Sequence, residues 1–159
     1  MSFRRNAGWV VCAAMCLFSA GPIFGHCEIP CGIYDDDMRV ALIREHIGTV
    51  EKSMKRIVEL GKKKPINYNQ LVRWIDNKEA HANKIQEIVY QYFMTQRIKP
   101  ASSNDKEARA KYVRELSALH ELLVYAMKAK QTTDQDNIAK MRKAIDTFSE
   151  SYFGKKEKK

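Results

Sequence analysis

Residues 35–61 read DDDMRVALIREHIGTVEKSMKRIVELG and carry a clear helical pattern. Three acids open the stretch, where they offer an N-cap and suit the positive end of a helix. Apolar residues then recur at helical spacing, namely Met38, Leu42, Ile43, Ile47, Val50, Met54, Ile57 and Val58. The pattern ends near Gly61, and a basic loop closed by Pro65 follows. The stretch therefore predicts one long amphipathic helix.

The same spacing predicts three further helices, at about residues 67–97, 105–130 and 138–152. Their inner faces are expected to carry Leu71, Trp74, Ile75, Ala82, Ile85, Ile88, Val89, Tyr92 and Phe93, then Ala108, Tyr112, Leu116, Leu119, Leu123, Ala126 and Met127, then Ile138, Met141, Ile145, Phe148 and Tyr152. No run has the pattern of a strand. Amphipathic helices with short loops predict an all-α, up-down-up-down four-helix bundle over residues 35–154, with a basic tail at 155–159.

The first 25 residues have the pattern of a secretory signal. Arg4 and Arg5 form a basic start, residues 8–20 are an apolar run that is short for a membrane span, and Gly25 offers a small residue for cleavage. An uncleaved anchor, an organelle-targeting leader or a propeptide removed by a dedicated peptidase are alternatives. We expect residues 1–25 to be removed by a processing peptidase. The product is then exported to the periplasm or outside the cell, with no stable membrane association, or is organelle-targeted or cytoplasmic after propeptide removal.

Composition fits a soluble helical domain, with 45% apolar and 30% charged residues. Cleavage would leave 134 residues (159 minus 25), enough for a core, with a net charge of +7 (9 minus 2). Much of that charge lies in residues 62–64 and 155–159, where solvated charge is the simplest interpretation. Steering of an anionic substrate, or attraction to nucleic acid or acidic lipid, is also open. No phosphate loop, Ser–His–acid arrangement or nucleic-acid motif is recognised, so we expect no nucleic-acid partner.

Residues 26–34 read HCEIPCGIY and bring several metal ligands into a short segment. After cleavage at Gly25, His26 would offer a free amine and an imidazole, beside the thiols of Cys27 and Cys31. Soft thiolates select nickel, copper(I), zinc or iron–sulfur, and square-planar sets containing nitrogen point to Ni(II) or Cu(II). Taken without its neighbours, the Cys-x3-Cys pair is also compatible with a simple disulfide.

This segment resembles the nickel hook of nickel-containing superoxide dismutases, and the matching residues are His26, Cys27, Pro30, Cys31, Gly32 and Tyr34. The resemblance implies a nickel ion bound by His26, Cys27 and Cys31. It further implies that His26 and Tyr34 are catalytic, with the His26 imidazole binding axially in the oxidised state and Tyr34 limiting access. Alternatively, Tyr34 only packs against the hook and has no part in catalysis. The expected activity converts superoxide to oxygen and hydrogen peroxide by Ni(II)/Ni(III) cycling, in a homohexamer.

The group that orients His26 is left open by the sequence. Some members of the resembled family place a glutamate early in the first helix, but residues 40–43 contain no carboxylate. Where an arginine from a neighbouring subunit is expected, Asn77 or Lys78 stands instead. Glu28, Glu45 or a backbone carbonyl are the remaining candidates. The other histidines are expected to be scattered surface or interface residues with no second metal, and they are His46, His81 and His120.

Two rival functions need different tests. A secreted helical bundle could bind nickel or copper at its N-terminus without catalysis, and superoxide turnover by the nickel-loaded protein would separate that from an enzyme. An interaction module could use a Cys27–Cys31 disulfide to tie down its terminus, and free-thiol titration before and after nickel loading would identify that. The sequence does not identify the source, the nickel-delivery partner or the processing protease.

Overall fold

The computed structural model describes residues 35–154, which form helices joined by short loops. The helices are α2 (Asp36–Gly61), α3 (Tyr68–Glu87), the π-helix η1 (Ile88–Arg97), α4 (Lys106–Gln131) and α5 (Asp136–Phe153). Because η1 directly continues α3, these segments make four rods, and the described residues contain no strand. The predicted all-α four-helix fold is confirmed. The predicted leader, hook and tail, residues 1–25, 26–34 and 155–159, lie outside the described residues.

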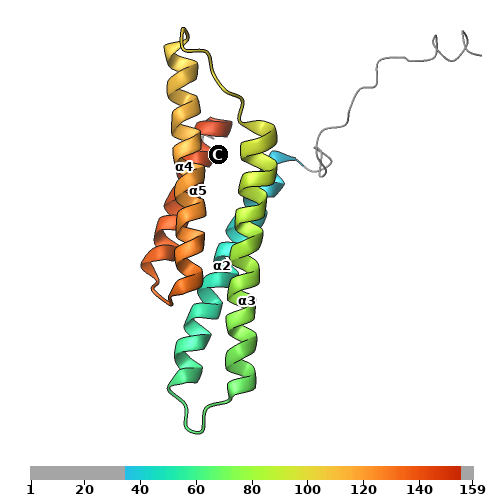
Figure 1. Cartoon of the computed structure of the whole chain (residues 1–159), viewed down its shortest axis with the longest axis vertical. Helices are drawn as coiled ribbons and strands as arrows, with labels where there is room; N and C mark the ends of the chain where they lie inside the picture. Colours follow the sequence, from blue (N-terminus) through green and yellow to red (C-terminus); the bar gives the residue numbers. More distant parts are fainter. Residues whose placement is uncertain (1–34, 155–159) are drawn as a thin grey trace, which may run out of the picture. The chain divides into compact units, whose positions relative to one another are not determined.

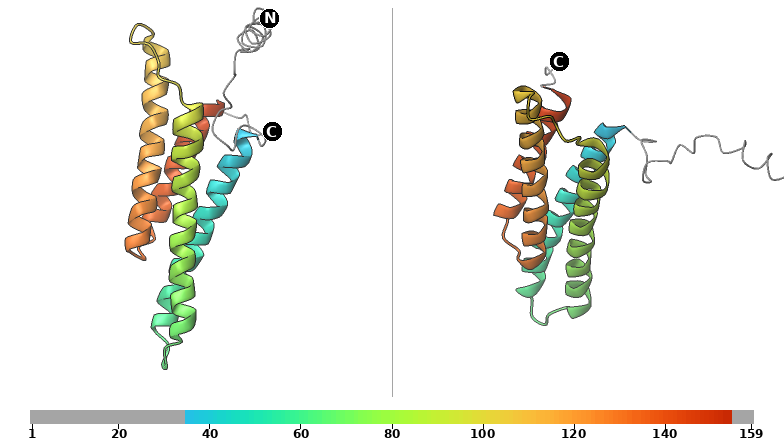
Figure 2. Two further views of the ribbon diagram at one scale, coloured as in Figure 1. Left: turned by 45° about the vertical axis from the view of Figure 1, so that its right-hand side comes forward. Right: turned by 45° about the horizontal axis from the view of Figure 1, so that its top comes forward.

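Successive helices run in opposite directions, so the bundle has the expected up-down-up-down course (Figure 1). α2 packs along α3, and α4 packs along α5. The two pairs meet where α3 contacts α4 and where α2 contacts α5, as the further views in Figure 2 also show. One end of the bundle therefore gathers the start of α2, the end of η1, the start of α4 and the end of α5.

Helix starts are fixed by local polar groups to different degrees. The side chain of Asn67 accepts a hydrogen bond from the Gln70 amide at 3.1 Å, which caps α3. Asp105 caps α4 in the same way through the Ala108 amide at 2.9 Å. Asp35 occupies the N-cap position of α2 but makes no capping hydrogen bond with its side chain. Side-chain capping by Asp35 therefore does not fix the start of α2, and the contacts of Asp36 with other helices are described below.

The buried core runs along the bundle and contains most of the predicted inner-face residues. Its largest fully buried side chains are Tyr92, Phe93, Phe148, Ile43, Ile47, Met54, Ile85, Leu119, Leu122, Met141, Ile145 and Val50. Four predicted inner residues are instead exposed, namely Met38 (50%), Val58 (40%), Ile75 (37%) and Met127 (38%). The end of the bundle formed by the α2–α3 loop extends past the α4–α5 turn, so the helix pair α2–α3 has fewer neighbouring helices there (Figure 1).

The helix predicted over residues 67–97 changes type in its last ten residues, where η1 forms a π-helix. Hydrogen bonds here span five residues: the Ile98 amide donates to the Phe93 carbonyl at 2.9 Å. The Thr95 hydroxyl likewise donates to the Tyr90 carbonyl at 2.6 Å. In a π-helix, residues five apart are hydrogen-bonded neighbours. This wider turn brings Tyr92 and Arg97 onto one face, which helical periodicity alone did not predict.

Candidate functional site

The predicted ligands His26, Cys27 and Cys31, and the predicted catalytic Tyr34, all lie outside the described residues. The site can therefore be described only from its base, where the chain enters the bundle at Asp35. That base is the end of the bundle at which α2 begins.

Asp36 is the centre of a polar network that joins three helices at this end. The Tyr152 hydroxyl of α5 donates to Asp36 Oδ2 at 2.8 Å. The Tyr92 hydroxyl of η1 donates to Asp36 Oδ1, and Arg97 Nε donates to the same oxygen at 3.0 Å. Both oxygens of one carboxylate are thus satisfied by groups from different elements. The first turn of α2 is tied directly to the ends of η1 and α5.

The phenols and the guanidinium of this network also contact one another. Arg97 Nη2 donates to the Tyr92 hydroxyl oxygen at 2.8 Å, and the Arg97 guanidinium carbon lies 5.0 Å from the Tyr92 ring centroid. Tyr152 stacks on Phe148, with ring centroids 5.2 Å apart and an interplanar angle of 24°. Phe93 meets Phe148 edge-on at 4.8 Å. A buried aromatic cluster therefore fixes the hydroxyls that hold Asp36.

The electrostatics of the network favour an ionised Asp36. Burial raises the pKa of this carboxyl, but hydrogen bonds from Tyr92 and Tyr152 and the charge of Arg97 outweigh burial, and the pKa is lowered overall. Burial and the hydrogen bond to Asp36 raise the pKa of both Tyr92 and Tyr152. The phenols stay protonated donors and the carboxylate stays an acceptor. The network is a fixed anchor, with no group prepared to exchange a proton near neutral pH.

The residues that stand where a neighbouring arginine was expected have roles inside this subunit. Asn77 Nδ2 donates to the Ser53 hydroxyl at 2.9 Å, which links α3 to α2. Lys78 is buried, with 5% of its surface exposed, and its ammonium donates to the Ala129 carbonyl at 2.9 Å at the end of α4. A cation at a helix C-terminus is stabilised by the unpaired carbonyls and the helix dipole. Both side chains stabilise the packing of the bundle.

His46 on α2 and His81 on α3 lie against each other, which the sequence did not predict. Their Nδ1 atoms are 3.1 Å apart, and their rings meet edge-on with centroids 4.9 Å apart. Burial lowers the pKa of both imidazoles, nearby Lys84 lowers it further, and Glu45 opposes the change. His120 on α4 is exposed, as expected for a surface residue. The 35-residue separation of the pair along the chain left no local sequence signal.

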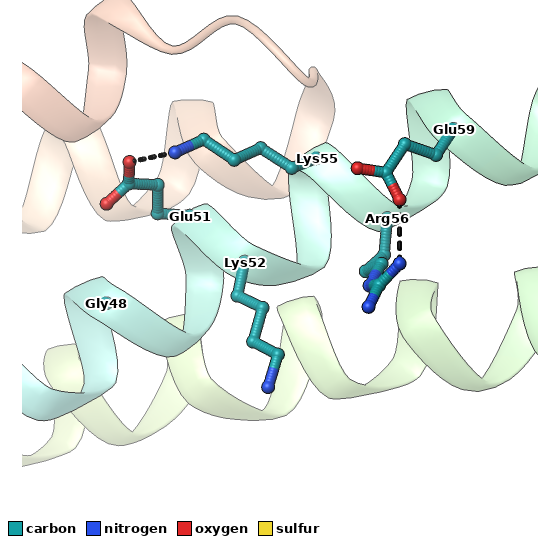
Figure 3. Close-up of a pocket in the computed structure, with 6 residues that line it drawn as sticks. All are labelled: Gly48, Glu51, Lys52, Lys55, Arg56 and Glu59. Atoms are coloured by element: carbon teal, nitrogen blue, oxygen red, sulfur yellow. Dashed lines mark hydrogen bonds and ion pairs between the residues drawn. The ribbon is translucent and has the colours of Figure 1, made fainter.

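A groove on the outer face of α2 is lined by Gly48, Glu51, Lys52, Lys55, Arg56 and Glu59 (Figure 3). Its charges are mostly paired: Lys55 Nζ lies 2.5 Å from Glu51 Oε1, and Arg56 Nη1 lies 2.8 Å from Glu59 Oε2. Hydrogen bonds from Lys55 and Arg142 lower the pKa of Glu51. Such exposed pairs neutralise one another, so this groove has the character of a solvated helix face.

Among residues 35–154, no group of three or more His, Cys, Asp or Glu side chains could hold a metal ion. No helix in the same range is long and apolar enough to cross a membrane. Beyond residue 25, thiols are supplied only by Cys27 and Cys31. His26 stands directly before Cys27 in the sequence, so a nitrogen donor lies beside these thiols, and such nitrogen and sulfur donors suit late transition metals.

Comparison with known proteins gives one result that covers most of the chain. Residues 20–156 match the family model described as nickel-containing superoxide dismutase. No curated protein and no solved structure matches the chain. The matched range includes the HCEIPCGIY segment and every described helix. Members of this family are oxidoreductases that act on superoxide and contain nickel. The chain therefore belongs to the nickel-containing superoxide dismutase family.

Proposed function

We propose that residues 26–34 hold the nickel ion of this superoxide dismutase after residues 1–25 have been removed. The observation that carries the proposal is the donor set itself: His26, Cys27 and Cys31 fall within six residues, inside the range that matches the family. The remaining cysteines, at positions 12 and 16, would be lost with the leader. The proposal therefore assigns the metal to the only segment of the processed chain that can supply thiolates.

Each proposed ligand has a chemical reason. The terminal amine of His26 has an ordinary pKa of about 7.7–8.0, so a metal can displace its proton near neutrality. Thiols with an ordinary pKa of about 8.5 bind as thiolates, and metal binding releases their protons. The His26 amine and the Cys27 amide nitrogen belong to one backbone step and can chelate together. Pro30 then turns the chain so that Cys31 completes the set.

The reaction converts two superoxide ions and two protons into oxygen and hydrogen peroxide. When bound by these ligands, nickel supplies a one-electron Ni(II)/Ni(III) couple that oxidises one superoxide ion and reduces another. The His26 imidazole would be a further ligand to the nickel ion. Tyr34 would limit access to the ion and orient substrate or water. The net charge of +7 on the processed chain (9 minus 2) favours approach of the anionic substrate.

The Asp36 network has a proposed part in this function as the base of the hook. Tyr34 precedes Asp36 by two residues, so the tether between them is short. Because Asp36 is hydrogen-bonded to α5 and η1, the first turn of α2, to which the hook is attached, is held in place. A fixed attachment point would reduce the conformational freedom that the hook must lose when it binds metal. Asp36 is thus a positioning residue in the proposal.

Assembly and location are further parts of the proposal. A segment of nine residues has too little apolar surface to bury itself, so subunits that pack around it would complete its surroundings. We infer a homohexamer, as the family resemblance implies. We also infer export, with cleavage after Gly25 by a processing peptidase, from the basic start, apolar run and small residue of the leader.

The decisive experiment compares two proteins, one that begins at His26 and one with a single extra residue before it. Both would be loaded with nickel and assayed for superoxide removal. The extension converts the His26 amine into an amide, so we expect the longer protein to be inactive although its helix content is unchanged. Equal activity would exclude the terminal amine as a required ligand. Cys27→Ser and Cys31→Ser are expected to abolish activity in the same assay without unfolding the bundle.

A further inference from the structure

The His46–His81 pair is a cluster of metal-ligating side chains that the proposed function does not use. The two imidazoles come from neighbouring antiparallel helices, α2 and α3, and each is half-buried at their interface. Each ring presents Nδ1 to the other, at a separation of 3.1 Å. Two nitrogen donors from rigid helices are thus brought to one point by the packing of the bundle.

This separation matches a shared metal ion. Zinc–nitrogen bonds are about 2.0–2.1 Å long, so two such bonds that enclose an angle of about 90–110° place the nitrogens about 2.8–3.4 Å apart. The 3.1 Å between His46 Nδ1 and His81 Nδ1 falls within that range. The edge-on arrangement, with an interplanar angle of 78°, leaves both rings room around a common ligand. Little movement of either helix is needed to admit the ion.

Without metal, the same geometry is a hydrogen bond in which one Nδ1–H donates to the other Nδ1 lone pair. Metal binding needs both lone pairs, so the bridging proton moves to Nε2 of its own ring. The surrounding charges are mixed, since Glu45 favours a bound cation and exposed Lys84 opposes it. In residues 35–154 no third His, Cys, Asp or Glu completes the group. Water would therefore fill the remaining coordination positions of a metal ion bound here.

We propose that His46 and His81 form a second, reversible metal site that takes a divalent late transition metal such as zinc, nickel or copper. Imidazole nitrogen suits all of these ions. Two protein ligands with open positions make the site weaker and more exchangeable than a hook with thiolates. A metal bound here would link α2 to α3, and it would stabilise the folded state by mass action.

The test uses the protein that begins at His26, already loaded with nickel, and titrates it with zinc by calorimetry. Zinc is chosen because it has no redox chemistry to confuse with that of the hook. We expect wild type to bind one more zinc ion per chain than His46→Gln or His81→Gln. His120→Gln is the matched control, because it removes an exposed imidazole from another helix, and it is expected to bind zinc like wild type. Circular dichroism would verify that every variant remains helical.

A second measurement separates direct ligation from an indirect effect of the substitutions. In the unsubstituted protein, zinc is expected to shift the imidazole NMR signals of His46 and His81 together, and to leave the His120 signal in place. Zinc should also raise the Tm of wild type but not of His81→Gln. Equal zinc stoichiometry in wild type and both pair variants, or a zinc shift confined to His120, would overturn the proposal.

Discussion

The Asp36 network and the His46–His81 pair both link α2 to other helices, yet they differ in how completely their polar atoms are satisfied. Asp36 receives donors from Tyr92, Arg97 and Tyr152 on both of its oxygens. The histidine pair shares one contact of 3.1 Å between two nitrogens. A saturated network resists change, whereas a pair joined by one shared proton can exchange that proton for another ligand. The first region suits anchoring and the second suits reversible binding.

Replacement of Asp36 is expected to have the largest effect, because it removes the acceptor at the centre of the hydrogen-bonded network. Asp36→Ala leaves two phenols and Arg97 without their shared acceptor, so we expect the free energy of unfolding to fall by about 2–3 kcal/mol. Urea unfolding at neutral pH measures it. Asp35→Ala is the matched control, because Asp35 is exposed and makes no capping hydrogen bond with its side chain. Similar losses in both variants would contradict an anchoring role for Asp36.

Lowering the pH tests the same network, because acid protonates Asp36 without replacing its side chain. The pKa of Asp36 is lowered in the folded state, so its ionised form contributes stability that is present above its unfolded pKa of about 3.9. That stability is lost as pH falls through the unfolded value toward the lower folded one. Between about pH 5 and pH 2, unfolding free energy should therefore fall more steeply in wild type than in Asp36→Asn. Parallel curves would remove Asp36 from the acid response.

A smaller change removes one donor from the network and keeps its ring. Tyr152→Phe retains the stacking on Phe148 and loses the 2.8 Å hydrogen bond to Asp36 Oδ2. Because the acceptor is charged and partly accessible, we expect a loss of about 1 kcal/mol in unfolding free energy. Phe153→Leu provides a neighbouring comparison, because it removes the edge-on ring contact of Phe153 with Tyr152 and keeps the Tyr152 hydroxyl. Thermal unfolding of Tyr152→Phe at wild-type Tm would show that its hydroxyl contributes nothing.

The weakest expected effect belongs to the histidine pair. His81→Gln removes one half-buried contact, and we expect a loss of about 0.5 kcal/mol in metal-free protein. His120→Gln, on an exposed position, should change stability by less than that. Denaturant unfolding with a chelator present measures both variants. A loss for His81→Gln as large as that for Asp36→Ala would show that the pair is a structural clamp, and the contrast between the regions would fail.

Local patterns predicted much of the fold. Apolar spacing identified the helical rods to within a few residues. The predictions were wrong where exposure or helix type depends on neighbouring helices, which the spacing of apolar residues does not specify. Val58 and Ile75 keep the helical period and are nevertheless exposed. The π-turn of η1 was also missed, because the same apolar residues fit an α-helix equally well.

In the candidate site, too, local residues could be predicted from the sequence and long-range partners could not. The proposed ligands His26, Cys27 and Cys31 lie within six residues of one another, so the sequence alone suggests them, and the family match covers this segment. The group expected to orient His26 could not be found by position. Asn77 and Lys78, which stood in the expected place, are engaged with Ser53 and the end of α4. Roles that depend on a partner far along the chain have no local pattern.

By itself the sequence determined the helical class and the approximate helix ends and suggested the proposed nickel ligands, because each depends on residues close together along the chain. Only the tertiary structure decided that Asp36 meets Tyr92, Arg97 and Tyr152, and that His46 meets His81. Those partners are separated by 35 to 116 residues. Their contact follows from helix packing, which selects one rotation and register for each rod, and short-range periodicity does not specify either.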